Sequence, residues 1–375
     1  MSLNSPFDGF WLPRSIREKV ISAEIEYKSS AFLHGQPCKT DHPDAVTARW
    51  PILKRDQLTT ILALLQGNRN RSPAGKAFWK RLEKAIDEVS QRLSNPSDPL
   101  RYKALNALPG YTGYSEPMIR YTLDSLDLIP LGNLPAAFDL SLTNRAAQEW
   151  QSMADTPGRI RFYPSGILSR SQGILPGLKN RPIFSPVGPV DLVLGYGAGN
   201  VPGTSLLIAF LAQATTIVNN NMLPAILIKN SRHEPLFTPL ILSAIENIDP
   251  ELVATTALLI WDYEDINIET FLLHQADLVI AAASDSTIAQ IQGHIEEVST
   301  PSHPVRFHAH GHKVSFSAVG AEVLTEGLVD PVSGRPMLDM ITLLTALDSI
   351  FWDQNGCLSS RIHFIEKVTS KGYTA

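Results

Sequence analysis

Short apolar segments alternate with helical patterns through the middle of this 375-residue chain, and no other feature constrains its fold as strongly. The apolar segments span residues 190–196, 225–229, 256–261, 276–282 and 305–309. Strands that are apolar on both faces are typical of parallel sheets covered by helices on both sides. We therefore predict a doubly wound α/β sheet that binds its ligand at the carboxyl ends of the strands.

Helices are predicted between these strands and, with less regularity, outside them. Apolar positions at helical spacing predict a helix over residues 74–93, and the turn residues of 96–113 indicate that this helical unit ends there. Ser115 is a suitable cap for a helix over residues 114–128. The other predicted helices span residues 55–65, 204–214, 236–245, 268–274, 284–294 and 337–350, and a last strand spans 361–366.

Charge and cysteine content exclude several classes of protein. A formal net charge of −5 gives no basic footprint, so we predict no nucleic-acid partner. No apolar run reaches the roughly 18 residues that cross a bilayer, and residues 1–11 lack the pattern of a secretory signal. The two cysteines, Cys38 and Cys357, are interpreted as reduced thiols of a cytoplasmic protein.

A glycine-rich turn, residues 195–203 (GYGAGNVPG), follows the first predicted strand of the sheet. It departs from the dinucleotide fingerprint, because Asn200 or Pro202 stands where G-x-G-x-x-G requires its last glycine. The turn is either a tight strand-to-helix connection or a ligand-binding loop. The side-chain amide of Asn200 could donate to a developing oxyanion or cap the following helix.

Cys357 is the candidate nucleophile. It follows Gly356 in a turn between the helix predicted over residues 337–350 and the last strand, where a thiol can be exposed and its backbone N–H can donate. The alternative is a small buried hydrophobic residue, the commonest role of a cysteine. Cys38 lies in the polar segment GQPCKT and lacks this setting.

Four ordered segments carry a family resemblance: residues 186–202, 225–232, 276–285 and 353–357. Together they resemble the acyl-CoA reductase family, the fatty-acid reductase component of bacterial luminescence and its relatives, within the aldehyde dehydrogenase superfamily. The likeness covers about residues 186–366, and residues 108–128 also look like this subfamily. It implies an aldehyde-dehydrogenase-like, Rossmann-type sheet with a helical N-terminal extension and an incomplete catalytic domain.

The resemblance also implies roles for individual residues. Cys357 would be the covalent nucleophile and Asn200 the oxyanion donor. Arg232 stands where many NAD-preferring relatives carry a glutamate, and because an arginine can accept a 2′-phosphate we predict NADPH as the cofactor. The alternative for Arg232 is a solvated side chain at a helix entry. The residues expected to bind the cofactor are Lys229, Ser231, Arg232 and Ser284.

Residues 309–313 (AHGHK) replace the Glu-Leu-Gly-Gly-Lys string of hydrolytic aldehyde dehydrogenases. Without that glutamate no base activates water, so the predicted reaction is reduction of a fatty acyl-CoA or other acyl thioester to an aldehyde through a thioacyl-enzyme. Ala309 disfavours the rival hypothesis, an aldehyde-oxidising dehydrogenase. The alternation of His308, His310 and His312 could instead bind zinc in a strand, but Gly311 and the resemblance favour a loop beside the active site, and no metal is predicted.

The predicted domain organisation follows the same resemblance. Residues 1–185 form a partly helical region that contributes to the cofactor domain, and residues 186–315 form the dinucleotide-binding domain. Residues 316–375 begin the nucleophile domain, which looks truncated because the family continues well beyond its cysteine. The competing prediction is a non-catalytic nucleotide-binding protein or a subunit that needs a partner. A homo-oligomer is compatible with either.

Overall fold

The computed structural model describes residues 6–69, 75–124, 151–152, 159–160, 190–215, 222–262, 265–312, 314–331, 333–356 and 359–367. The chain divides into two compact units, Met1–His310 and Gly311–Ala375, and each is described by itself. Within the described residues, no helix is both long and apolar enough to cross a membrane.

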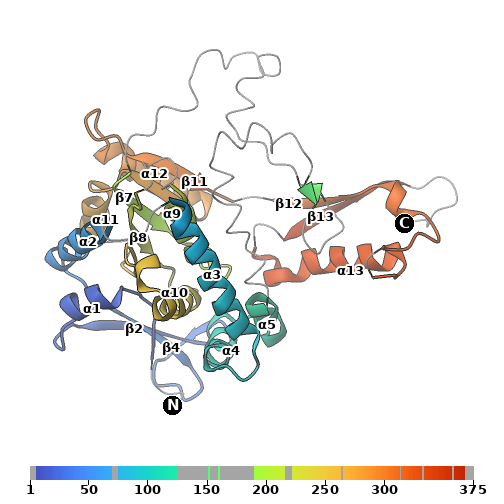
Figure 1. The fold of residues 1–375 in the computed structure, drawn as a ribbon, viewed down its shortest axis with the longest axis horizontal. Helices are drawn as coiled ribbons and strands as arrows, with labels where there is room; N and C mark the ends of the chain where they lie inside the picture. Colours follow the sequence, from blue (N-terminus) through green and yellow to red (C-terminus); the bar gives the residue numbers. More distant parts are fainter. Residues whose placement is uncertain are drawn as a thin grey trace. The chain divides into compact units, whose positions relative to one another are not determined.

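A five-stranded sheet forms the centre of the first unit (Figure 1). All its neighbouring strands are parallel, in the order β11-β10-β7-β8-β9, which confirms the predicted parallel α/β sheet. Its first strand in sequence is central, so the strand order reverses between β7 and β10. The strands are β7 (Leu192–Tyr196), β8 (Ala225–Lys229), β9 (Thr256–Leu259), β10 (Leu278–Ala282) and β11 (Arg306–His310).

Helices cover both faces of this sheet, and its strands are apolar at nearly every position except in β11 (RFHAH), whose last three residues are exposed. Leu192 and Leu194 belong to one apolar core with helix α2, whereas a side chain at Gly195 would meet Ile208 of α9 on the other face. The helices of the sheet layers are α2 (Arg55–Arg69), α9 (Thr204–Ala214), α10 (Phe237–Ile248), α11 (Ile266–Leu273) and α12 (Asp285–Val298), with the 3-10 turn η4 (Pro250–Leu252) after α10.

A second, four-stranded sheet lies near the N-terminus and was not predicted. Its strands are β1 (Phe7–Asp8), β2 (Tyr27–Leu33), β3 (Gln36–Cys38) and β4 (Val46–Pro51), in the order β1-β4-β2-β3, with helix α1 (Arg14–Val20) between the first two. Trp11 joins this region to the large sheet. Its N–H and C=O exchange hydrogen bonds of 2.8 Å with Leu258 of the edge strand β9.

Three helices follow: α3 (Gly75–Ser94), α4 (Pro99–Thr112) and α5 (Glu116–Asp124). The prediction that residues 96–113 form turns was wrong. Asp98 caps α4 through the Leu100 N–H, Pro99 takes the first helical position, and Gly113 ends the helix in a left-handed conformation. The residues that suggested turns are therefore the start and stop signals of a helix.

The second unit contains a two-stranded parallel sheet, β12 (Ser315–Val319) and β13 (Ser360–Ile365), with helix α13 (Met337–Ile350) packed against β13. Two 3-10 turns, η5 (Ala321–Leu324) and η6 (Phe351–Gln354), flank the helix in sequence. The bounds of α13 agree with the predicted helix. The first unit also contains two two-residue strands, β5 (Gln151–Ser152) and β6 (Arg159–Ile160), which pair antiparallel.

Candidate active site

The turn between β7 and α9 is packed too tightly for side chains at its glycines. A Cβ atom on Gly197 would lie 2.0 Å from Ser205 Oγ, and one on Gly199 would lie 2.1 Å from Ser231 Oγ. Gly203 has φ +92°, a left-handed conformation that favours glycine. The glycines are thus explained by close approach and backbone geometry, without the dinucleotide fingerprint.

Asn200 is exposed within this turn, at the carboxyl edge of the sheet. The hydroxyl of Tyr114 donates to its backbone carbonyl. The N-cap position of α9 is occupied by Gly203, three residues after Asn200. An exposed amide on a fixed backbone has the geometry needed to donate to a ligand.

Lys229 ends β8, beside the end of β7, with its side chain largely buried. Its ammonium lies 3.5 Å from Oε2 of the buried Glu269 and about 5 to 6 Å from the ring centres of Trp261 and Tyr196. Glu269 also accepts hydrogen bonds of 2.7 Å from Tyr196 Oη and Trp261 Nε1. Burial lowers the pKa of Lys229, and the Glu269 charge opposes this shift.

Arg232 lies three residues beyond Lys229 and forms an ion pair with Asp262. Asp262 also pairs with Lys28, so two cations share one carboxylate. The guanidinium lies over the ring of Trp50, 5.7 Å from its centre. The interpretation of Arg232 as merely solvated was therefore incomplete: its side chain is 43% exposed, but it is placed by a partner.

The two serines expected to bind the cofactor make local hydrogen bonds. Ser231 Oγ accepts the His233 N–H at 3.1 Å and lies against the glycine turn. Ser284 is the N-cap of α12, where its Oγ accepts the Thr287 N–H at 3.3 Å. Ser284 therefore opens the helix that follows β10, at the point where the strand order reverses beside β7.

Cys357, the predicted nucleophile, lies outside the described residues, as does Lys313. Its placement relative to Asn200 accordingly stays a prediction. Cys38, half-buried in β3, is a free thiol.

His308 and His310 lie in strand β11 with their rings 4.6 Å apart, and the loop begins only at Gly311. The expectation of a loop was thus wrong for His310, whereas His308 lies within the strand predicted over residues 305–309. In the part of the chain that the structure describes, no group of three or more His, Cys, Asp or Glu side chains is placed to hold a metal.

Three acidic residues were missed from the sequence: Glu269, Asp262 and Glu234, which is buried beside the glycine turn. Glu269 carried a detectable signal, since it is an acid within the apolar helical segment INIETFLL. Asp262 and Glu234 lie in loops, and no sequence pattern marks either of them.

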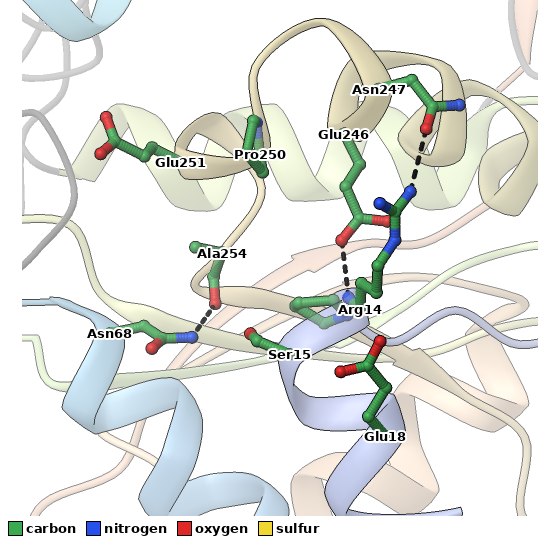
Figure 2. A pocket seen from close by; sticks show the side chains of 10 residues that line it. Arg14, Ser15, Glu18, Asn68, Glu246, Asn247, Pro250, Glu251 and Ala254 are labelled. Atoms are coloured by element: carbon green, nitrogen blue, oxygen red, sulfur yellow. Dashed lines mark hydrogen bonds between the residues drawn. The ribbon is translucent and has the colours of Figure 1, made fainter.

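A cavity of about 600 Å³ lies elsewhere in the first unit (Figure 2). Arg14 and Glu246 meet in it, and Asn68 donates to the carbonyl of Ala254, which precedes β9. The cavity therefore opens near the amino end of the sheet's edge strand. Parallel sheets of this kind bind ligands at the carboxyl ends, so we place the candidate site at the glycine turn.

The residues at the carboxyl edge fit a dinucleotide. The sheet reverses its strand order between β7 and β10, the position where doubly wound sheets bind nucleotides. The glycine turn follows one of these strands and the start of α12 follows the other. Lys229 and Arg232 add cations suited to hydroxyl and phosphate oxygens.

Comparisons with known proteins agree with this architecture. The family model "LuxC: Acyl-CoA reductase (LuxC)" matches residues 177–373, just over half of the chain. No curated protein sequence matches.

Two solved structures show the fold at low sequence identity. The Δ-pyrroline-5-carboxylate dehydrogenase of Mycobacterium tuberculosis is 11% identical with a TM-score of 0.54; the match covers 97% of this chain and 55% of that one. Proline utilization A of Bdellovibrio bacteriovorus is 10% identical with a TM-score of 0.53, covering 97% and 31%.

The Mycobacterium enzyme has also been solved with NAD and cobalamin bound, and that structure matches with a TM-score of 0.53 at 11% identity over 97% of this chain and 55% of its own. This chain thus spans only about half, or less, of the length of these structures. By its family match, the chain belongs to the LuxC family of acyl-CoA reductases, and it shares the fold of these dehydrogenase structures.

Proposed function

We propose that this chain reduces an acyl thioester, such as a fatty acyl-CoA, to an aldehyde with NADPH, through a thioacyl intermediate on Cys357. The LuxC family match carries the proposal, because it spans both the glycine turn and Cys357. The exposed Asn200 at the carboxyl edge of a nucleotide-binding type of sheet supports it.

The proposed chemistry begins with attack of the Cys357 thiolate on the thioester carbonyl. The Asn200 amide and the Cys357 backbone N–H stabilise the tetrahedral oxyanion. The oxyanion collapses, the bond to the CoA sulfur breaks, and CoA leaves as its thiolate while the acyl group stays on Cys357. NADPH held at the carboxyl edge of the sheet would supply a hydride to the acyl carbon and become NADP+, which leaves a thiohemiacetal oxyanion on Cys357. The thiohemiacetal then breaks its C–S bond, which releases the aldehyde and restores the Cys357 thiolate.

The residues after β8 support nicotinamide binding in this proposal. Lys229 is positioned by Glu269 to donate to ribose hydroxyls, and Ser231 and Ser284 flank the same edge of the sheet. Arg232 shares Asp262 with Lys28, and its side chain is 43% exposed. A guanidinium pairs with the 2′-phosphate of NADPH, a group that NADH lacks.

The decisive experiment is intact mass measurement after incubation with an acyl-CoA and no nucleotide. The native chain should gain one acyl group, and Cys357→Ala should gain none. Cys38→Ala is the matched control and should be acylated like the native chain. Acylation that persists in Cys357→Ala, or its absence from the native chain, would contradict the proposal.

A second candidate is a nucleotide-binding protein without thioester chemistry, or a subunit completed by a partner. The second unit favours it, because α13 has no buried residue and Phe316 and Phe364 are exposed. Such a protein would bind NADPH yet remain unmodified by acyl-CoA. The mass experiment together with NADPH titration therefore separates the two candidates.

The remaining assignments accompany this proposal. We assign residues 1–185 and 186–315 to the cofactor domain and residues 316–375 to the nucleophile domain. A cytoplasmic setting is consistent with substrates that are nucleotides and thioesters. Fractionation of cells and gel filtration of the purified chain would test location and a homo-oligomer.

A further inference from the structure

Glu234 is a buried carboxylate in the loop between β8 and α10, with 4% of its surface exposed. Its Oε1 accepts the N–H of Leu236 at 3.0 Å and that of Phe237 at 2.8 Å. A third backbone donor is the N–H of Gly203, at the end of the glycine turn. One side chain therefore joins two segments that are more than thirty residues apart in sequence.

These three donors belong to the starts of two helices. Gly203 is the N-cap of α9 and Leu236 is the N-cap of α10, and neither uses its own side chain as a cap. The first N–H groups of a helix lack partners within the helix and carry partial positive charge. Glu234 accepts from such groups on both helices through one buried carboxyl group.

The same carboxylate limits the movement of the turn that bears Asn200. Tyr114 holds the carbonyl of Asn200, and Glu234 holds the N–H of Gly203, three residues later. Phe237 also packs 3.2 Å from where a Cβ of Gly203 would stand, so the turn has little room on that side. Fixing an oxyanion donor in advance is what makes it effective in the transition state.

We propose that Glu234 is a positioning residue, which sets the Asn200 amide for the oxyanion by holding Gly203 against the start of α10. This inference rests on the function proposed above. Its electrostatic surroundings include Tyr111 of α4, whose pKa is raised by burial and by the Glu234 charge. Tyr111 in turn donates to the carbonyl of Arg232 at 2.8 Å, within the same loop.

A double-mutant cycle of Asn200→Ala and Glu234→Gln tests the proposal in the full chain. Loss of one oxyanion donor should lower kcat about 100- to 1000-fold, and Glu234→Gln should lower kcat about tenfold without changing KM for NADPH. Glu234→Gln should cost nothing further in the Asn200→Ala background, because it acts through that amide. An equal tenfold loss in both backgrounds would overturn the proposal. Glu246→Gln, at the other end of α10, is the control.

Amide hydrogen exchange gives a readout that does not need activity. In Glu234→Gln the exchange of residues 200–204 should rise about tenfold, while Glu246→Gln leaves it unchanged. Tyr114→Phe removes the hydrogen bond to the Asn200 carbonyl and should raise amide exchange in the same segment. Unchanged exchange in Glu234→Gln would overturn the positioning role. An inactive native chain with this exchange response would instead count against the proposed reaction alone.

Discussion

The two units of the chain differ in how they bury their strands. In the first unit, every residue of β7 and β9 is buried, and helices cover both faces of the sheet. In the second unit, α13 is strongly apolar in sequence yet has no buried residue, and Phe316 and Phe364 of its sheet are more than half exposed. Parallel strands are normally covered on both faces.

The comparison shows that forming a helix or strand and burying it in a core are separate steps. The sequence pattern predicts α13 as well as it predicts α9, so local propensity is sufficient for both helices. In the first unit many apolar side chains form a buried core, whereas in the second unit α13 packs against β13 and Phe316 contacts Phe364 while both rings stay exposed. We infer that the first unit supplies most of the stability of the chain, and that the second has apolar surface available for contacts.

Matched truncations of isoleucine give the largest expected contrast. Ile228→Ala in β8 removes a fully buried side chain and should lower the free energy of unfolding by about 2–5 kcal/mol. Ile362→Ala in β13 removes a half-exposed one and should stay within about 0.5 kcal/mol. Urea denaturation followed by tryptophan fluorescence measures both. Equal losses would break the comparison.

The pH dependence of stability should reveal the buried charge of the first unit. Burial raises the pKa of Glu234 from 4.5 to about 7, against the opposing effect of its N–H donors. Between these two values the folded chain keeps a proton that the unfolded chain releases, so stability falls as pH rises through this window. At about 1.36 kcal/mol per pH unit, the loss amounts to about 3 kcal/mol.

Urea denaturation at pH 4.5 and at pH 8 checks this for the native chain and for Glu234→Gln. The variant should lack the fall, since it has no proton to release at that position. Glu326→Gln, an exposed residue of the second unit, serves as the matched control and should behave like the native chain. A variant that retains the full fall would show that another group causes it.

The smallest of the expected effects is on nucleotide affinity, which should depend on residues of the first unit alone. Arg232→Ala should weaken NADPH binding about tenfold, or about 1.4 kcal/mol, and should change NADH binding little, because only the 2′-phosphate needs the extra charge. Phe364→Ser in the second unit should alter neither. Fluorescence titration with both nucleotides measures this. An equal effect of Arg232→Ala on NADH would remove the case for a phosphate site.

The large sheet could be predicted from sequence because its strands are apolar on both faces, and strands of that kind are stable in water only when helices cover them. The four-stranded N-terminal sheet could not: β2 reads YKSSAFL, in which only Ala31 and Phe32 are buried. Helix α4 was missed because Pro99 and Gly113 are turn residues whose meaning depends on their position relative to a helix.

The candidate site was predictable in part for a similar reason. Lys229 lies at the end of a recognisable strand, so its place at the carboxyl edge followed from the fold. Its partner Glu269 and the partner of Arg232, Asp262, come from later in the chain, and such pairs form only when folding brings distant segments together. The burial of Glu234 depends equally on tertiary packing.

The pairing of Trp11 with Leu258 has a consequence for how the chain avoids self-association. An unpaired edge strand is a template for pairing with another chain, and in the folded chain Trp11 occupies part of that edge beside β9. During synthesis, however, β9 is made long after Trp11. The segment around Trp11 must therefore remain unpaired until β9 emerges, and a chain without this pairing would leave that edge of the sheet open to other chains.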